Sequence, residues 1–317
     1  MSNKIKTLIK GVYINQKILI DLFLRKKRNQ IIIKQNIKKK IFPVEIISGM
    51  GLFANLTFAL YITKYCQEQK LTPHFKFTLE NSTIKGNPFD YFFKIKSNNK
   101  KQLGKINYAK MKSWSDLNMN IDWTKYQSLN IQSAEDLINK HFTINKSVLD
   151  KVESFYNEKL KNKNVLGLHY RATDKCSEAN LLSYNYIIKQ LNIYIEKYPQ
   201  TELLFVSTDD INFIPYLENN FLKIPITYNQ DSFRSNNQIS THKSGKNLYD
   251  INLDAITNCL LLSKCTRLMK TASILSAWSK LFNPDLPVII LSKPKEAFNF
   301  FPEKQVAEST LYEVSNS

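Results

Sequence analysis

Three short polar segments carry side chains suited to binding a nucleotide. They are HYRATDK at residues 169–175 (the first motif), STDD at residues 207–210 (the second motif) and TAS at residues 271–273 (the third motif). An arginine guanidinium forms paired hydrogen bonds to phosphate oxygens, and the amides that open a helix bind phosphate as well. Carboxylates and imidazole can bond to a base and a ribose. These residue types favour a nucleotide diphosphate as the ligand.

Each motif follows an apolar run of strand length, and the runs alternate with longer segments at helical spacing. The pattern predicts strands at residues 165–168, 203–206, 224–228, 267–270 and 288–291, and helices at 184–198, 211–221, 253–262 and 274–282. Such alternation is typical of a doubly wound α/β domain, in which ligands bind outside the carboxyl ends of the strands. We therefore expect the three motifs to lie together at that edge.

The first half of the chain begins with a similar unit. A strand is expected at residues 43–47, a turn containing Gly49 and Gly51 follows, and a helix is expected at residues 53–66. Residues 89–141 are rich in aromatics and asparagine but weakly periodic, and they yield no assignment. We expect two α/β domains, residues 1–150 with a basic leading segment and residues 151–317.

Bulk composition narrows the function classes. With 43 % apolar residues the 317-residue chain is globular, and its four cysteines form no CxxC pair, so neither a zinc site nor a disulfide framework is expected. Asp21 interrupts a short apolar run and four basic residues follow it, so we expect no signal peptide or membrane span. The expected location is the cytoplasm, with peripheral contact at the inner face of the membrane.

The formal net charge of +18 has two interpretations. Scattered lysines among many asparagines and isoleucines are typical of compositional drift, whereas the basic stripe from Arg25 to Lys40 favours an anionic partner such as acidic lipid or nucleic acid. The individual motif residues also have purely structural interpretations. Asp209, Thr271 and Ser273 are good helix caps, and a histidine that ends a strand is often an ordinary hydrogen-bonding residue.

In order and spacing, the motifs resemble those of fucosyltransferases. The first is similar to H-x-R-R-T-D-K of the α1,6-fucosyltransferases and bacterial nodulation fucosyltransferases, and to H-x-R-R-G-D of the α1,2-fucosyltransferases. The second resembles the A-T-D-D motif of these enzymes. Ser263 together with the third motif, which contains Thr271 and Ser273, resembles their pattern L-x-S-x₇-T-x-S. The similarity covers residues 165–283, with a weaker echo at Gly49 and Gly51.

This resemblance implies a GT-B-like fold of two Rossmann-type domains, with the donor site at the carboxyl edge of the C-terminal sheet and the acceptor on the N-terminal side. It also implies inverting transfer of fucose from GDP-fucose to a hydroxyl of a glycan or glycolipid, without a metal or other cofactor. By resemblance, Arg171 holds the β-phosphate, His169 lies against guanine and Ser273 binds phosphate. Glu178 falls near the catalytic glutamate of the family.

Roles for the remaining candidates follow from their chemistry. Arg171, supported by Lys175, would stabilise the leaving diphosphate, and an acid would take the acceptor's proton. Glu178 is the favoured base, with Asp174 and Asp90 as alternatives. The full set of expected donor-binding residues is His169, Asp174, Asp209, Asp210, Asp254, Asn258, Thr271, Ser273, Gly49 and Gly51.

Two departures from the family pattern keep other functions open. Ala172 replaces the second arginine of the first motif, and Asn258 stands where many members have an aspartate, which Asp254 one helical turn earlier could replace. A transferase that uses another sugar nucleotide is one alternative. The other is a non-catalytic basic protein that binds an anionic membrane or nucleic acid; for the transferase itself no nucleic-acid partner is expected.

Overall fold

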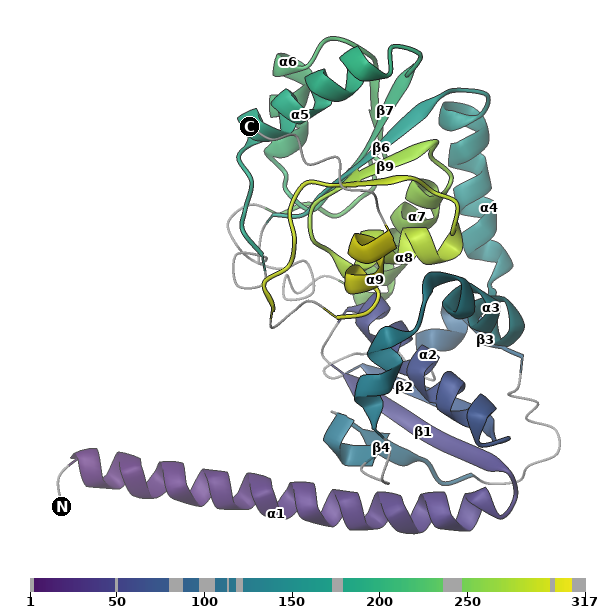
Figure 1. Ribbon diagram of the computed structural model, residues 1–317. Helices are drawn as coiled ribbons and strands as arrows, with labels where there is room; N and C mark the ends of the chain where they lie inside the picture. Colours follow the sequence, from purple (N-terminus) through teal and green to yellow (C-terminus); the bar gives the residue numbers. More distant parts are fainter. Residues whose placement is uncertain are drawn as a thin grey trace.

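Two lobes stacked along one axis make up the protein, and a long helix runs beneath the lower lobe (Figure 1). The computed structural model describes residues 3–48, 51–79, 88–96, 106–112, 114–117, 122–172, 179–235, 247–296 and 300–309. No helix in these ranges combines the length and the apolarity needed to cross a membrane.

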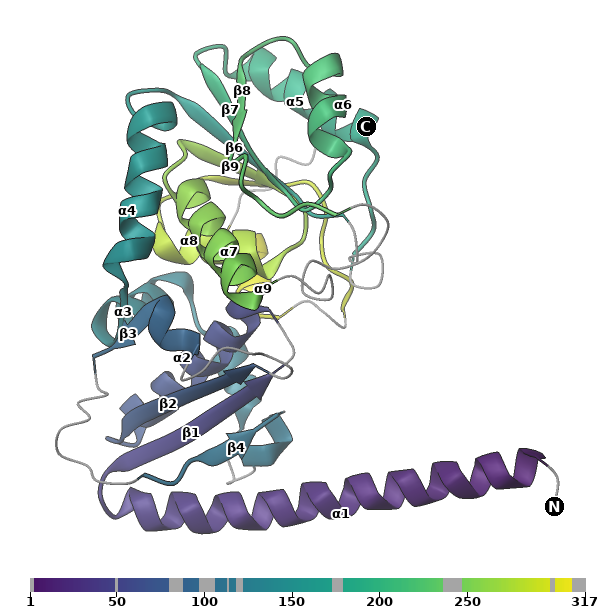
Figure 2. The same cartoon turned by 180° about the vertical axis from the view of Figure 1, so that it is seen from behind.

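The N-terminal lobe is built on a parallel sheet of order β2-β1-β4. Its elements are α1 (Asn3–Ile37), β1 (Ile41–Ser48), α2 (Leu52–Glu68), β2 (Thr72–Leu79) and β4 (Ala109–Met111). In register, Ile41 lies opposite Thr72 and Ser48 opposite Leu79. Helix α2 lies between this sheet and the C-terminal lobe, whereas α1 runs along the far side (Figures 1 and 2).

Smaller elements complete this lobe. Strands β3 (Phe93–Ile95) and β5 (Phe142–Ile144) form an antiparallel pair. The lobe also contains the short helices η1 (Pro88–Tyr91), η3 (Trp114–Leu117) and η4 (Trp123–Ser128) and the longer helix α3 (Ile131–His141). Except for α3, these elements are short, and a three-residue strand or one to two helical turns is too short to show a clear hydrophobic period.

The C-terminal lobe contains a five-stranded parallel sheet of order β10-β9-β6-β7-β8. After α4 (Lys146–Phe155) and a π turn (Tyr156–Leu160), the chain forms β6 (Val165–Tyr170), α5 (Tyr184–Lys197), β7 (Leu203–Thr208), α6 (Phe213–Asn220), β8 (Ile226–Tyr228), α7 (Leu248–Ser263), β9 (Arg267–Lys270), α8 (Ile274–Phe282), β10 (Val288–Ile290) and α9 (Glu303–Ser309). The strand order reverses between β6 and β9, which defines a topological switch point. The predicted α/β class is confirmed.

Alternate residues of β6 and β7 enter two different cores. Val165 and Phe205 pack on the α7–α8 side, whereas Leu166 and Val206 pack on the α5–α6 side. Gly167 lies where the strand approaches α7 closely, since an added Cβ would be 3.0 Å from the Cys265 sulfur. A side chain there would push α7 away from the strand.

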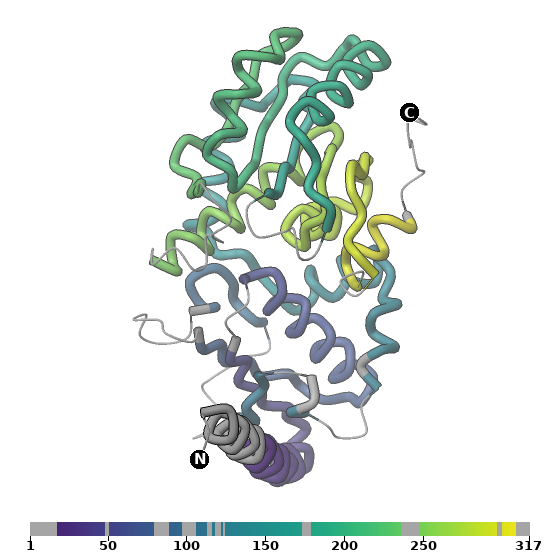
Figure 3. Tube along the Cα trace, turned by 90° about the vertical axis from the view of Figure 1, so that its left-hand side faces the viewer, coloured from purple at the N-terminus to yellow at the C-terminus, as the bar shows by residue number. Residues whose placement is uncertain are grey.

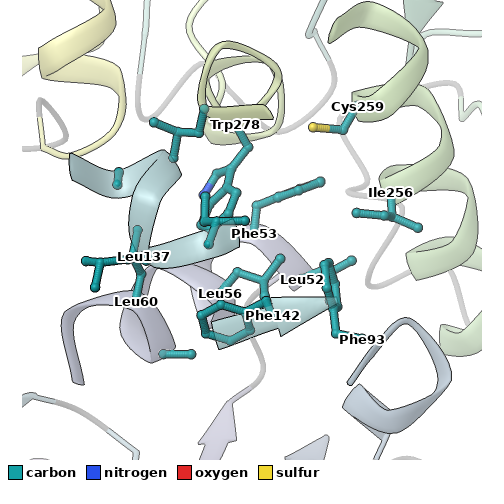
Figure 4. Close-up of a cluster of buried hydrophobic side chains, with 14 of the residues drawn as sticks. Leu52, Phe53, Leu56, Leu60, Phe93, Leu137, Phe142, Ile256, Cys259 and Trp278 are labelled. Carbon is teal, nitrogen blue, oxygen red and sulfur yellow. The ribbon is translucent and has the colours of Figure 1, made fainter. Parts of the chain in front are cut away.

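One hydrophobic core joins the two lobes (Figure 4). The rings of Phe53 on α2 and Trp278 on α8 have centroids 5.8 Å apart. The indole N–H of Trp278 also donates to Thr57 Oγ1 at 3.1 Å, and both side chains are buried. The lobes therefore share packed interior rather than meeting only at a polar surface.

Helix α1 is the largest element that the sequence pattern did not predict. Its second half is not a separate leading segment, because Ile33 and Asn29 are buried against the N-terminal sheet. Asn29 Nδ2 donates to the carbonyl oxygens of Lys110 and Asp116 at 2.7 and 2.9 Å. Figure 3 shows α1 nearly end-on beneath this lobe.

Candidate functional site

The first and third motifs meet at the switch point, because Arg171 follows β6 directly and Thr271 follows β9. The Arg171 backbone N–H donates to Thr271 Oγ1 at 2.8 Å, and the Thr271 N–H donates to the His169 carbonyl at 3.0 Å. The convergence expected from the strand pattern is therefore observed. It fixes the backbone of Arg171 from a segment one hundred residues away in the sequence.

The second motif holds the Arg171 side chain. Arg171 Nη1 lies 2.8 Å from Asp209 Oδ2, and the Ala172 N–H donates to Asp209 Oδ1 at 3.0 Å. Both side chains are largely buried, with exposed fractions of 16 % for Arg171 and 6 % for Asp209. The capping interpretation of Asp209 is wrong, because α6 begins only at Phe213 with Asn212 as its N-cap.

Asp210 links the end of β7 to the start of α5 and α6. Its Oδ2 accepts the Tyr184 hydroxyl at 2.5 Å, and its Oδ1 accepts the Asn212 N–H at 3.0 Å. Burial, followed by this hydrogen bond to Asp210, raises the pKa of Tyr184 above its ordinary value. Burial also raises the pKa of Tyr170 to about 12. Asp210 thus holds the starts of α5 and α6 against the end of β7, next to Asp209.

A carboxylate from α9 occupies the N-terminus of α8. Glu303 Oε1 accepts the Ser273 N–H, and the two Glu303 oxygens bind Lys270 Nζ at 2.8 and 2.7 Å. The Lys270 side chain is fully buried. The Ser273 amide expected to bind phosphate therefore already has an anionic partner within the chain. The sequence analysis did not predict this pair. The only indication in the sequence was a lysine at the end of an apolar strand.

Asp254 and Asn258 lie together on α7, as their spacing predicts. Asp254 Oδ1 accepts Asn258 Nδ2 at 2.7 Å and the Ser232 hydroxyl at 2.6 Å, while Oδ2 accepts the Phe233 N–H at 3.3 Å. Burial raises the pKa of Asp254, although the hydrogen bonds from Ser232 and Phe233 oppose that shift. The carboxylate therefore organises the loop that follows β8.

That loop brings a second arginine to the same sheet edge. The Arg234 guanidinium carbon lies 5.0 Å from the Tyr228 ring centroid, and Nη2 donates to the Asn229 carbonyl at 2.8 Å. Burial lowers the pKa of Arg234. The next residue, Ser235, donates its N–H to the Asp209 carbonyl at 2.8 Å. Arg234 was not predicted; its position just beyond an expected strand was the available clue.

The remaining candidates divide into two groups. Lys175, Glu178, Asp174 and Gly49 lie outside the described residues. Gly51 is the N-cap of α2 with φ −64° and ψ 164°, which is extended backbone open to other residues. Asp90 is exposed on η1 in the N-terminal lobe, and its neighbour Tyr91 packs against Tyr249 at the start of α7 with ring centroids 5.3 Å apart.

The described edge combines the guanidinium groups of Arg171 and Arg234 with the carboxylates of Asp209, Asp210 and Asp254. In the described ranges no three histidine, cysteine or acidic side chains are arranged to hold a metal ion. Cys66, Cys259 and Cys265 are buried free thiols, and burial raises the pKa of each.

No family model matches the sequence. No curated protein matches it either. Among solved structures, a variant of FUT1 from Arabidopsis thaliana in complex with GDP aligns over 89 % of this chain and 81 % of its own, with 12 % identity and a TM-score of 0.50. POFUT1 in complex with GDP aligns over 78 % of this chain and 98 % of its own, with 9 % identity and a TM-score of 0.50.

The chain has the fold of these fucosyltransferases. The resemblance inferred from the motifs is thereby confirmed at the level of the fold, as is the GT-B-like architecture. The fucosyltransferase NodZ from Bradyrhizobium aligns over 78 % of this chain and 96 % of its own, with 13 % identity and a TM-score of 0.47.

Proposed function

We propose that this protein is an inverting glycosyltransferase that transfers fucose from GDP-fucose to a hydroxyl of a glycan or glycolipid. The observation that carries the proposal is the environment of Arg171. The guanidinium stands at the switch point of a parallel sheet, where such folds bind nucleotides, and Asp209 holds it at 2.8 Å. The shared fold supports the proposal, since the two aligned transferases are described as complexes with GDP.

Arg171 is the proposed phosphate ligand. Asp209 binds one end of the guanidinium and also accepts the N–H of Ala172, so the side chain is positioned before any ligand arrives. Because the Ser273 amide is bound to Glu303, we assign a larger share of the diphosphate to Arg171 than the motif alone implies. His169, Asp254 and Asn258 are proposed to lie on the base side of the donor.

The proposed reaction breaks the bond between the fucose anomeric carbon and the β-phosphate oxygen, while an acceptor oxygen attacks from the opposite face. Negative charge grows on the leaving diphosphate, and Arg171 with Lys175 would stabilise it. Glu178 is the proposed base for the acceptor proton, with Asp174 and Asp90 as alternatives. Guanidinium and amide donors would take the part that a metal ion plays in other transferases.

A thermal-stability panel tests this proposal. GDP and GDP-fucose should stabilise the protein with EDTA present, by about 2.7 kcal/mol at a hundredfold excess over the dissociation constant. UDP and UDP-sugars serve as comparison ligands for the choice of base, and GDP-mannose for the choice of sugar. A shift that EDTA abolishes, or a stronger response to UDP-sugars, would overturn the donor assignment. Hydrolysis of GDP-fucose, or transfer of its fucose to a glycan, is then measured by chromatography and tests the enzyme class.

A further inference from the structure

Helix α1 is fixed on the N-terminal lobe along one face. Arg25 Nε lies 2.6 Å from Asp116 Oδ1, and Asn29 exchanges hydrogen bonds with the backbone of Lys110 at 2.7 and 2.8 Å. Ile32 and Ile33 are buried one turn later. These contacts determine which face of the helix points away from the protein.

The opposite face carries a row of exposed apolar side chains. Ile20, Phe23, Leu24 and Ile31 have exposed fractions of 58, 56, 57 and 57 %. Their spacing of three, four and seven residues places them on one side of a helix. Lys27 lies within this row, with Nζ 4.6 Å from the Phe23 ring centroid. We call Ile20, Phe23, Leu24, Lys27 and Ile31 the outer face of α1.

The charge of this part of α1 is predominantly positive, although Arg25 is paired with Asp116 on the docked face. From residue 18 to residue 40 the sequence holds eight lysines and arginines and one acid, Asp21. A second copy of the same helix would bring like charges together and be repelled. The phosphates of a nucleic acid would pair with the lysines, but four large apolar side chains would then lie against a charged phosphate backbone. A surface with negative headgroups above an apolar layer fits both features.

We propose that the outer face of α1 docks on an anionic membrane surface, with the helix lying in the interfacial plane. Because α1 runs along the side of the N-terminal lobe that faces away from the C-terminal lobe, the membrane would lie beneath both lobes (Figures 1 and 2). The candidate site would then open above the membrane, where a lipid-linked glycan acceptor could reach it; this last step rests on the proposed function.

Vesicle sedimentation of the full chain tests the docking surface. Phosphatidylcholine vesicles are compared with vesicles containing about 30 % phosphatidylglycerol, at about 0.1 M salt. The protein should bind the anionic vesicles and release progressively as salt rises. Ile20→Ser/Leu24→Ser and Lys27→Glu/Lys34→Glu should each weaken binding about tenfold or more. All four side chains are exposed, so circular dichroism should be unchanged.

Matched variants on the C-terminal lobe control for general stickiness and charge. Leu222→Ser removes an apolar side chain that is 84 % exposed, and Lys161→Glu/Lys189→Glu reverses two exposed charges. Both should bind vesicles within about twofold of the parent, because only charges near the surface contribute. GDP stabilisation measured without vesicles should be the same in every variant, so failure of the proposed donor and failure of this surface are separate results.

Three outcomes would overturn the docking proposal. The first is equal binding to neutral and anionic vesicles. The second is tighter binding to a short DNA duplex than to the vesicles, with the same DNA affinity in the Ile20→Ser/Leu24→Ser variant. That result would identify nucleic acid as the partner. The third is a dimer in sedimentation equilibrium that the same double variant dissociates, which would identify a second copy of this chain.

Discussion

Arg171 owes its position to contacts from two other parts of the chain. Thr271 accepts its backbone N–H and Asp209 binds its guanidinium, so the residue is held at both ends. Ala172, which replaces a second arginine, contributes only its N–H to Asp209. The Asp209 carboxylate therefore binds one cation of the first motif, Arg171. Among the described residues of that motif, no second cation can replace Arg171 if it is removed.

Arg171→Lys and Arg171→Ala should stay folded while losing transfer activity. We expect a fall of about 10² to 10³ in rate and weaker GDP binding, because lysine cannot reproduce a forked bond to phosphate oxygens. Transfer from GDP-fucose and GDP affinity are the measurements. Arg267→Lys is the matched control, since Arg267 stands at the amino end of β9, 4.4 Å from the Tyr198 ring centroid. Near-normal turnover of folded Arg171→Ala would reject the site.

The meeting of Arg171, Asp209 and Thr271 could be predicted from the sequence because parallel strands place their carboxyl ends at one edge. The pairing of Lys270 with Glu303 could not. Thirty-three residues separate the two, and a single lysine in a short strand gives no information about its partner. Arg234 was missed for a similar reason, since its position depends on a loop held by Asp254.

At the scale of elements, α9 is tied to the sheet by a buried ion pair. Lys270 closes β9, Ser273 opens α8, and Glu303 at the start of α9 binds both. The carboxylate complements the positive end of α8, and the lysine neutralises it. One glutamate thus fixes three elements around the third motif.

Glu303→Gln should lower the free energy of unfolding by about 3–5 kcal/mol, because it leaves the Lys270 charge buried without its partner. Lys270→Met combined with Glu303→Gln should recover part of that loss, since the amide oxygen can still accept the Ser273 N–H and no buried charge remains. Denaturant unfolding followed by circular dichroism measures both. If the double variant is less stable than the single one, the buried charge is not the source of the loss.

Periodicity predicted the elements whose buried positions are mostly apolar. The bounds expected for β9 and α8 agree with the structure because apolar residues fill most of their buried positions, although Lys270, Ser276 and Ser279 are buried as well. Helix α1 was missed for the opposite reason. Its docked face relies on Arg25 and Asn29 as well as isoleucines, so part of that face looks polar in the sequence. Hydrogen bonds to Asp116 and Lys110 compensate for their burial.

At the scale of the whole molecule, the two lobes share one core. Helix α3 of the N-terminal lobe and α2 both contact α8. The predicted division at residue 150 falls within α4 and stays a prediction. Since Trp278 packs against Phe53 and donates to Thr57, neither lobe completes its interior alone.

Guanidinium unfolding of the protein should therefore show one cooperative transition in both lobes. Trp278→Ala should lower the free energy of unfolding by about 3–5 kcal/mol, the usual loss when a large buried aromatic is removed. Hydrogen exchange read out by peptide mass should show faster opening in both β1 and β6. Two separate transitions in the parent protein would show that the lobes are independent units.

The shared core also constrains how a bound nucleotide could leave. A hinge motion that parted the lobes would expose Trp278, Phe53 and Leu56 to water, at roughly 25 cal/mol for each Å² of apolar surface. Such an opening would be rare, so under the proposed function it is a poor route for a product that leaves in every catalytic cycle. Donor and product are instead expected to enter and leave at the carboxyl edge of the C-terminal sheet, where local rearrangement and not separation of the lobes would limit turnover.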